Sequence, residues 1–143
     1  MIQIRTEKID PWKEIQRYQN SLNIQGKFGA TAVFVGSMRD MNEGEQVSAM
    51  TLEHYPGMTD KYLHKITQEA HQQWPLLDSL ILHRVGDVYP DDTIVVVAVW
   101  STHRADAFTA CRSLMEQLKS EAPFWKKEQL SNGSRWVEKN TPG

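Results

Sequence analysis

The run TIVVVAVW, from Thr93 to Trp100, is the stretch that most directly indicates the fold. Its residues are almost all apolar or β-branched, a composition typical of a buried strand. A similar run, GATAVFVG from Gly29 to Gly36, predicts another buried strand. Ser79–Val85 predicts a third, separated from the first by a turn at residues 90–92 (Pro-Asp-Asp).

Three helices are expected beside these strands. Asp10 and Pro11 predict an N-cap followed by proline at the first helical position. Apolar residues recur every four positions from Met58 to Trp74, which predicts a helix that ends before proline. The helix that begins at Pro11 should bury an apolar side made of Trp12, Ile15 and Leu22. A third helix is expected after Ser101 or Thr102, either of which can cap it. Its core stripe is Ala107, Cys111, Leu114 and Leu118.

Further strands fill the rest of the chain. VSAMTLEHY, at residues 47–55, predicts a strand antiparallel to the one at residues 29–36, after a polar loop at residues 39–46. Two strand-like runs around an Asn-Gly turn predict a hairpin near the C-terminal end. Several predicted strands follow one another directly, without a helix between them, which excludes a doubly wound parallel sheet. The prediction is an α+β fold, with a largely antiparallel sheet covered by helices.

Composition limits the class of protein. The 143 residues carry a formal charge of −2 and are 40% hydrophobic, which favours one domain over residues 1–143. No run has the length of a membrane span and the N-terminus lacks a signal-peptide pattern, so a cytoplasmic protein with no membrane partner is expected. The basic excess lies in residues 101–143, which favours a small anionic ligand or an acidic tail over nucleic acid.

Metal and nucleotide sites are not expected. The single cysteine excludes a disulfide or a cysteine-rich metal site, and Cys111 falls in an apolar stripe that predicts a buried thiol. His64 and His71 lie two helical turns apart, too far for one ion. The glycines match no phosphate-binding loop, so no metal and no cofactor is predicted.

Cationic side chains are the remaining candidates for chemistry. Arg39 follows the end of a buried strand, and His103-Arg104 follows another and opens a helix, where backbone N–H groups favour anions. Lys119 lies in the last turn of that helix, where a favourable interaction with the helix dipole is an equally good explanation. Lys126 and Lys127 follow two aromatic residues, a setting that can lower a lysine pKa or strengthen anion binding.

Five blocks of sequence together resemble one known family. They are GATAVFVGSMRD, LEHYPGM, HRVGDVYPDD, VWSTHRADAF and LKSEAPFWKKE followed by RWVE, and they occur in order between about residues 28 and 138. This arrangement resembles the large, catalytic subunit of molybdopterin synthase. The resemblance implies a hammerhead-like α/β architecture.

The resemblance also implies a reaction and partners. The enzyme would be a sulfurtransferase of molybdenum cofactor biosynthesis, converting cyclic pyranopterin monophosphate to the dithiolene of molybdopterin. Sulfur would come from the C-terminal glycine thiocarboxylate of a small ubiquitin-like sulfur-carrier subunit. A central homodimer with one small subunit at each end, a heterotetramer, is implied.

Family motifs assign roles to residues of this chain. The catalytic pair falls on Lys119 and Lys126. The substrate-binding positions, which include that pair, are Ser37, Met38, Arg39, His103, Arg104, Lys119, Lys126, Lys127 and Glu128. Ser37 departs from the family pattern, because relatives often carry a lysine there.

Two other functions are compatible with parts of the sequence. A single-stranded nucleic-acid-binding module could use the FWKK and HR segments, although the net charge disfavours it. A scaffold that only docks a ubiquitin-like protein would need no catalytic lysine.

Overall fold

A computed structural model describes residues 1–137 and places three helices and nine strands within them. The helices are α1 (Pro11–Ser21), α2 (Met58–Gln73) and α3 (Arg104–Glu121). The strands are β1 (Ile2–Arg5), β2 (Ala30–Ser37), β3 (Met41–Asn42), β4 (Glu45–His54), β5 (Leu76–Arg84), β6 (Gly86–Val88), β7 (Thr93–Ser101), β8 (Phe124–Leu130) and β9 (Gly133–Trp136). The predicted α+β class is confirmed.

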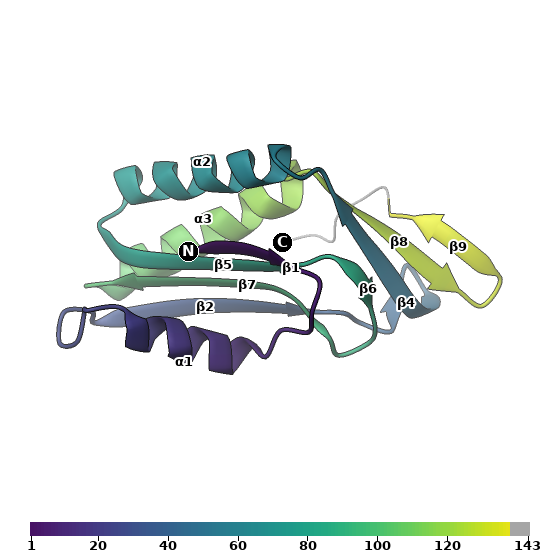
Figure 1. Cartoon of the computed structure of the whole chain (residues 1–143), viewed down its shortest axis with the longest axis horizontal. Helices are drawn as coiled ribbons and strands as arrows, with labels where there is room; N and C mark the ends of the chain where they lie inside the picture. The colour runs from purple at the N-terminus through teal and green to yellow at the C-terminus, as the bar shows by residue number, and fades with distance from the viewer. Residues whose placement is uncertain (138–143) are drawn as a thin grey trace.

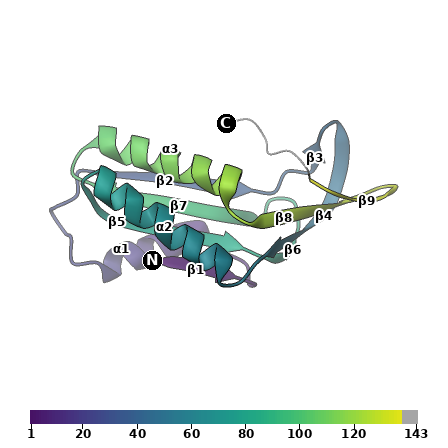
Figure 2. The same cartoon turned by 90° about the horizontal axis from the view of Figure 1, so that it is seen from above.

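A four-stranded sheet forms the body of the molecule in the order β1-β5-β7-β2. β1 runs parallel to β5, and the other neighbours are antiparallel. Figure 1 shows α1 on one face of this sheet and α2 and α3 on the other, and Figure 2 shows α2 and α3 side by side across it. All nine residues of β7 are buried because both faces of this strand are covered.

The core has two parts because side chains alternate along β7. Val95, Val97 and Val99 belong to the part that includes α2 and α3 side chains, such as Leu63 and Leu114. The intervening residues belong to the part packed by α1 side chains: Val96, Ala98 and Trp100. The predicted stripe on α3 is buried as expected, including Cys111.

A second sheet lies at one end of the first (Figure 1) and has the order β3-β4-β8-β9, with β6 also paired to β4. The chain passes from the first sheet to the second between β5 and β6, at Val85 and Gly86. Gly86 has a φ of 89°, which glycine adopts without steric cost. The ends of β2 and β5 and the start of β7 therefore meet β8.

The prediction that residues 47–55 pair with residues 29–36 is wrong. β2 pairs with β7, whereas β4 pairs with β3, β6 and β8. Backbone hydrogen bonds between Met38 and residues 91 and 92 hold the chain where it leaves β2, and the next hairpin then joins the second sheet. Neighbours in sequence are not always neighbours in a sheet.

Two helix details also differ from the prediction. The N-cap of α3 is His103, without a side-chain cap bond, because the Ser101 hydroxyl instead donates to the Pro75 carbonyl. Trp12 is 65% exposed, so α1 uses Ile15 and Tyr18 against the sheet. The predicted Asp10 cap is confirmed by its hydrogen bond from the backbone N–H of Lys13.

None of the helices within residues 1–137 is long and apolar enough to cross a membrane.

Gly29→Ala should destabilise the fold. The Gly29 N–H donates to the Ser101 carbonyl at 3.0 Å, and a β-carbon at Gly29 would collide with the Thr102 carbonyl oxygen. We expect the free energy of unfolding to fall by about 1–3 kcal/mol in urea titrations. Thr31→Ala, at an exposed position of β2 two residues along the chain, is the control. Equal stability of Gly29→Ala and the wild type would contradict this close approach.

Candidate active site

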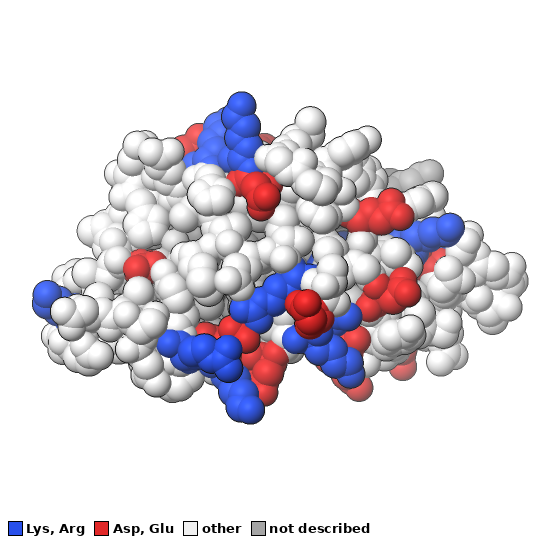
Figure 3. Space-filling view, viewed as in Figure 1, with Lys and Arg blue, Asp and Glu red and all other residues white. Residues whose placement is uncertain are grey.

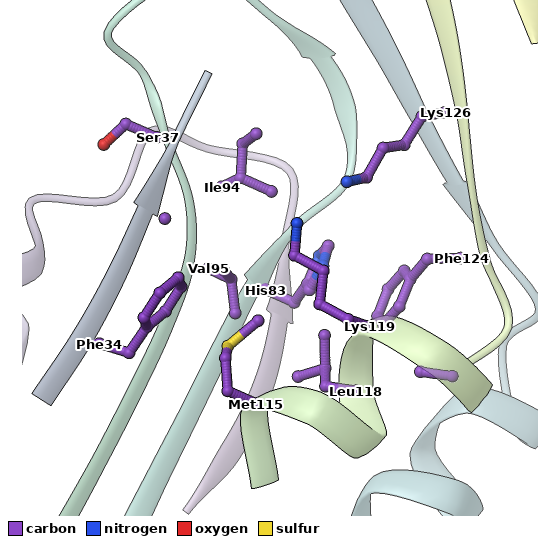
Figure 4. Close-up of a pocket in the computed structure, with 12 residues that line it drawn as sticks. Phe34, Ser37, His83, Ile94, Val95, Met115, Leu118, Lys119, Phe124 and Lys126 are labelled. Atoms are coloured by element: carbon purple, nitrogen blue, oxygen red, sulfur yellow. The ribbon is translucent and has the colours of Figure 1, made fainter. Parts of the chain in front are cut away.

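A pocket opens where the two sheets and the C-terminal end of α3 meet (Figure 4). An adjoining pocket shares four of its lining residues: Ser37, Ile94, Lys119 and Lys126. The walls of the first pocket are mostly apolar, with Phe34 from β2 and Phe124 from β8 among them. Charged groups in such a setting are shielded from water, so their interactions are stronger than on the surface.

Lys119 and Lys126 converge in this pocket. Figure 4 shows their side chains pointing toward one another, Lys119 from α3 and Lys126 from β8. The proximity of Lys119 is one cause of a lowered pKa at Lys126. Two ammonium groups that lie close together in a pocket shielded from water repel each other, which favours the loss of a proton from one of them.

The electrostatic environment lowers the pKa of Lys126. Burial, followed by the charge and the proximity of Lys119, lowers this pKa to about 8. Glu128 acts in the opposite direction. About a tenth of Lys126 is therefore a neutral amine at pH 7, and about half at pH 8.

Glu128 lies on the same face of β8 as Lys126 and also lines the adjoining pocket. Glu128 is 5% exposed. Its carboxylate accepts hydrogen bonds from Arg135 Nε at 3.0 Å and Asn42 Nδ2 at 3.1 Å. Arg135 also donates to the Asn42 carbonyl. These bonds fix β9 and β3 around the pocket and hold a negative charge near Lys126.

The predicted segment at the end of β2 reaches the site. Ser37, Met38 and Arg39 all line the adjoining pocket with the two lysines. Met38 is buried, whereas Arg39 is exposed and its guanidinium is accessible to a ligand. The structure therefore brings together six predicted site residues: Ser37, Met38, Arg39, Lys119, Lys126 and Glu128.

Three predicted site residues lie elsewhere in this chain. His103 and Arg104 are at the N-terminal end of α3, about 22 Å from Lys119 along the helix at 1.5 Å per residue. Lys127 points to the other face of β8, where its Nζ lies 5.7 Å from the centre of the Trp136 ring. None of the three lines either pocket. The RWVE block extends to Glu138, which lies outside the described residues.

His83 is a pocket residue to which sequence reasoning gave no role. It lines the pocket from the end of β5, is 3% exposed and stacks on Phe124 with ring centres 3.7 Å apart. Burial, and then the charges of Lys126, His54 and Lys119, lower its pKa to about 3, although the Arg84 carbonyl opposes this shift. The available signal was a histidine directly after the apolar run Leu80–Leu82 of β5.

The thiol and the histidines give no sign of other chemistry. Cys111 is buried, and burial raises the pKa of its thiol to about 11, consistent with the predicted core role. Within residues 1–137, no cluster of His, Cys, Asp and Glu has the arrangement of a metal site. In Figure 3, acidic and basic groups lie next to one another on the visible face, without a continuous basic patch there.

Comparisons with known proteins agree on one family. A family model described as MoaE protein matches residues 4–121. A Ralstonia nicotianae protein named molybdopterin synthase catalytic subunit is 57% identical over 112 residues, 78% of this chain and 64% of that protein. The chain thus spans slightly less than two thirds of this relative. The Pseudomonas aeruginosa protein of the same name is 49% identical over 96% of this chain and 89% of its own length.

Solved structures give the same result. Molybdopterin synthase from Staphylococcus aureus is 33% identical, with a TM-score of 0.84 over 95% of this chain and 96% of that chain. A Helicobacter pylori structure described as a complex of subunits 1 and 2 of molybdopterin-converting factor shares the fold. Its TM-score is 0.81 at 21% identity, over 99% of this chain and 93% of that chain. These matches confirm the family resemblance of the sequence blocks.

Lys126→Met should stabilise the fold in a pH-dependent way. The pKa of Lys126 is about 8 in the folded protein, against an ordinary value of 10.5, so its ammonium disfavours the folded state below pH 8. Between these values the folded protein releases a proton that the unfolded chain retains, and the wild type regains stability as pH rises. We expect Lys126→Met to raise the free energy of unfolding by about 1–2 kcal/mol near pH 7, after allowance for solvent screening.

Urea unfolding at about pH 7 and about pH 9.5 measures this effect. The advantage of Lys126→Met should shrink at the higher pH. Lys127→Met, on the opposite face of the same strand, is the matched control and should show no such change. A destabilised Lys126→Met at both pH values would show that the ammonium stabilises the fold.

Proposed function

We propose that this chain, which belongs to the MoaE protein family, is the catalytic subunit of a molybdopterin synthase. It acts as a sulfurtransferase of molybdenum cofactor biosynthesis. Sulfur passes from the C-terminal thiocarboxylate of a small ubiquitin-like sulfur-carrier subunit to cyclic pyranopterin monophosphate, forming the dithiolene of molybdopterin. The names and the extent of similarity of its relatives support this assignment.

The observation that carries the chemistry is the convergence of Lys119 and Lys126 in a largely apolar pocket. The substrate phosphate and the thiocarboxylate are both anions, and oxyanions develop as sulfur displaces oxygen. A fixed ammonium in a water-poor pocket stabilises such charges without reorganising. The neighbouring neutral amine can exchange a proton with the reacting groups, because its pKa lies close to neutral pH.

Substrate contacts divide into two groups under this proposal. Ser37, Met38, Arg39 and Glu128 surround the lysine pair within one chain. His103 and Arg104 lie at the far end of α3, so contact with the same substrate molecule requires them to come from a second copy. A homodimer within a heterotetramer supplies that copy. The edge strand β2 has two exposed apolar residues, Val33 and Phe34, that suit such an interface.

The wider setting follows from the same proposal. The whole chain, residues 1–143, acts as one domain in the cytoplasm, in keeping with relatives named for a biosynthetic step. The small subunit docks so that its C-terminal tail reaches the lysine pair. The Helicobacter pylori complex supports a two-subunit assembly for proteins of this fold.

The nucleic-acid-binding alternative receives no support from these relatives. A docking scaffold without catalysis is distinguished by turnover. Incubation of the protein with a thiocarboxylated sulfur-carrier protein and cyclic pyranopterin monophosphate, followed by mass detection of the dithiolene product, tests the proposal. Product is expected only when all three are present. Failure of the wild-type protein to form it with an intact carrier would refute the function.

Substitutions of the lysines should reduce activity when the side chain lies in the pocket and have less effect when it lies on the opposite face of β8. Lys119→Ala should abolish sulfur transfer and leave the fold intact, and Lys126→Ala should lose most activity. Lys126→Arg should recover only part, because a planar guanidinium does not replace a compact amine. Lys127→Ala should be the mildest, since its side chain points away from the pocket. Product formation at saturating partner measures all four; a Lys127→Ala more damaged than Lys126→Ala would reverse the assignment.

Arg39→Ala and Arg104→Ala should weaken capture of the phosphate-bearing substrate. Each removes a charge-assisted contact worth about 1.5–3 kcal/mol, or about 10- to 150-fold in affinity. Calorimetric titration of the free protein with the cyclic substrate measures the change. Arg112→Ala is the control, because Arg112 is exposed on α3 and paired with Glu116 at 2.9 Å. Unchanged affinity in both test variants would place the phosphate elsewhere.

A further inference from the structure

His83 lies at the floor of the lysine pocket, and neither the family motifs above nor the names of the relatives give it a role. Its ring is 3% exposed and stacks on Phe124 almost in parallel, with an interplanar angle of 9°. It lines the pocket together with Lys119 and Lys126 (Figure 4). A polar ring buried this completely requires defined hydrogen-bond partners.

The hydrogen bond of Nδ1 determines the tautomer. Nδ1 lies 2.7 Å from the backbone carbonyl oxygen of Arg84. A carbonyl oxygen only accepts, so Nδ1 must carry a proton and donate it. In a neutral ring, Nε2 then holds a lone pair and is an acceptor.

The surroundings keep the ring neutral. The titratable groups that interact with it are Lys126 from β8, His54 from β4 and Lys119 from α3, and each disfavours a second proton on the ring. The neighbouring strands contribute apolar side chains, Ile4 from β1 and Val95 from β7. Together with burial, this environment lowers the pKa of His83 to about 3.

We propose that His83 is a positioning residue for the sulfur-transfer reaction, a fixed neutral acceptor whose Nε2 takes a hydrogen bond from a lysine N–H in the pocket. The role in the reaction rests on the function proposed above, whereas the tautomer and the stacking of the ring do not. An ammonium group has three N–H donors. One directed to His83 and one to the other lysine leave the third aimed at the anion.

The fixed position of the acceptor is what makes this arrangement useful. Phe124 holds the plane of the ring and the Arg84 carbonyl holds its rotation, so Nε2 cannot follow a moving lysine. Glu128, the acid near Lys126, has its carboxylate engaged by Arg135 and Asn42. His83 therefore selects the orientation of the ammonium without neutralising its charge.

The tautomer can be tested on the wild-type protein without any variant. Nitrogen NMR of protein labelled with ¹⁵N-histidine distinguishes Nδ1–H, Nε2–H and doubly protonated rings. We expect His83 to be neutral with the proton on Nδ1 from about pH 5 to about pH 9. An Nε2–H tautomer or a protonated ring in this range would overturn the proposal.

Two variants test the role in the reaction. His83→Phe keeps a flat ring against Phe124 but has no acceptor, and His83→Gln keeps an acceptor near the place of Nε2. Removing an acceptor from an ammonium disfavours its charged form. For His83→Phe we expect kcat to fall at least about tenfold, KM to stay within about twofold, and the lysine limb of the pH profile to move down by about one unit.

The matched control is His54→Phe, because His54 also stacks on Phe124, at 6.2 Å, but does not line the pocket. It should keep the wild-type kcat and pH profile, and His83→Gln should recover part of the loss.

A folded His83→Phe with wild-type kcat and pH profile would overturn the role, and equal losses in His83→Gln and His83→Phe would do the same. If His83→Phe does not fold, the nitrogen spectrum and His83→Gln decide. Absence of turnover by the wild type would instead contradict the proposed reaction, while the spectrum would still decide the tautomer and charge of His83.

Discussion

Two lysine side chains converge in a pocket with mostly apolar walls, and two full positive charges cannot remain there at low cost. This constraint explains the chemistry of the site. Lys126 gives up its proton near pH 8, well below the ordinary range of a lysine, while Lys119 beside it supplies positive charge. An anionic tail or substrate that enters the pocket meets both a cation and a neutral amine. Glu128 and His83 tune the pair, one by charge and the other, as proposed here, by a fixed hydrogen bond.

The pocket exists because the chain builds two sheets that meet beside the end of α3. Gly86 carries the chain from β5 into β6, and the short turn after α3 leads into β8 of the second sheet. Lys119 lies in the last turn of a helix packed on the first sheet, whereas Lys126 belongs to the second. Their contact therefore depends on how the two sheets pack, and the glycine and buried core residues that set this packing support function as well as stability.

Much of this structure could be predicted from local patterns. The apolar run of β7, the four-residue periodicity of α2 and the alternation that separates Lys126 from Lys127 are all properties of nearby residues. The pairing of β4 could not be predicted, because it depends on hydrogen bonds between Met38 and residues distant in sequence. The same limit applies to the site. Its lysines were found through family motifs, but His83 gains its role from Phe124, which is far along the chain.

A direct measurement of the central claim is the titration of the lysine side chains by NMR, in the wild type and in Lys119→Ala. The account predicts one lysine in the wild type with a pKa of about 8, assigned to Lys126. That pKa should rise in Lys119→Ala, because the neighbouring charge is removed. Lysines that all titrate near the ordinary value of about 10.4 in the folded wild-type protein would contradict the lowered pKa on which the site depends.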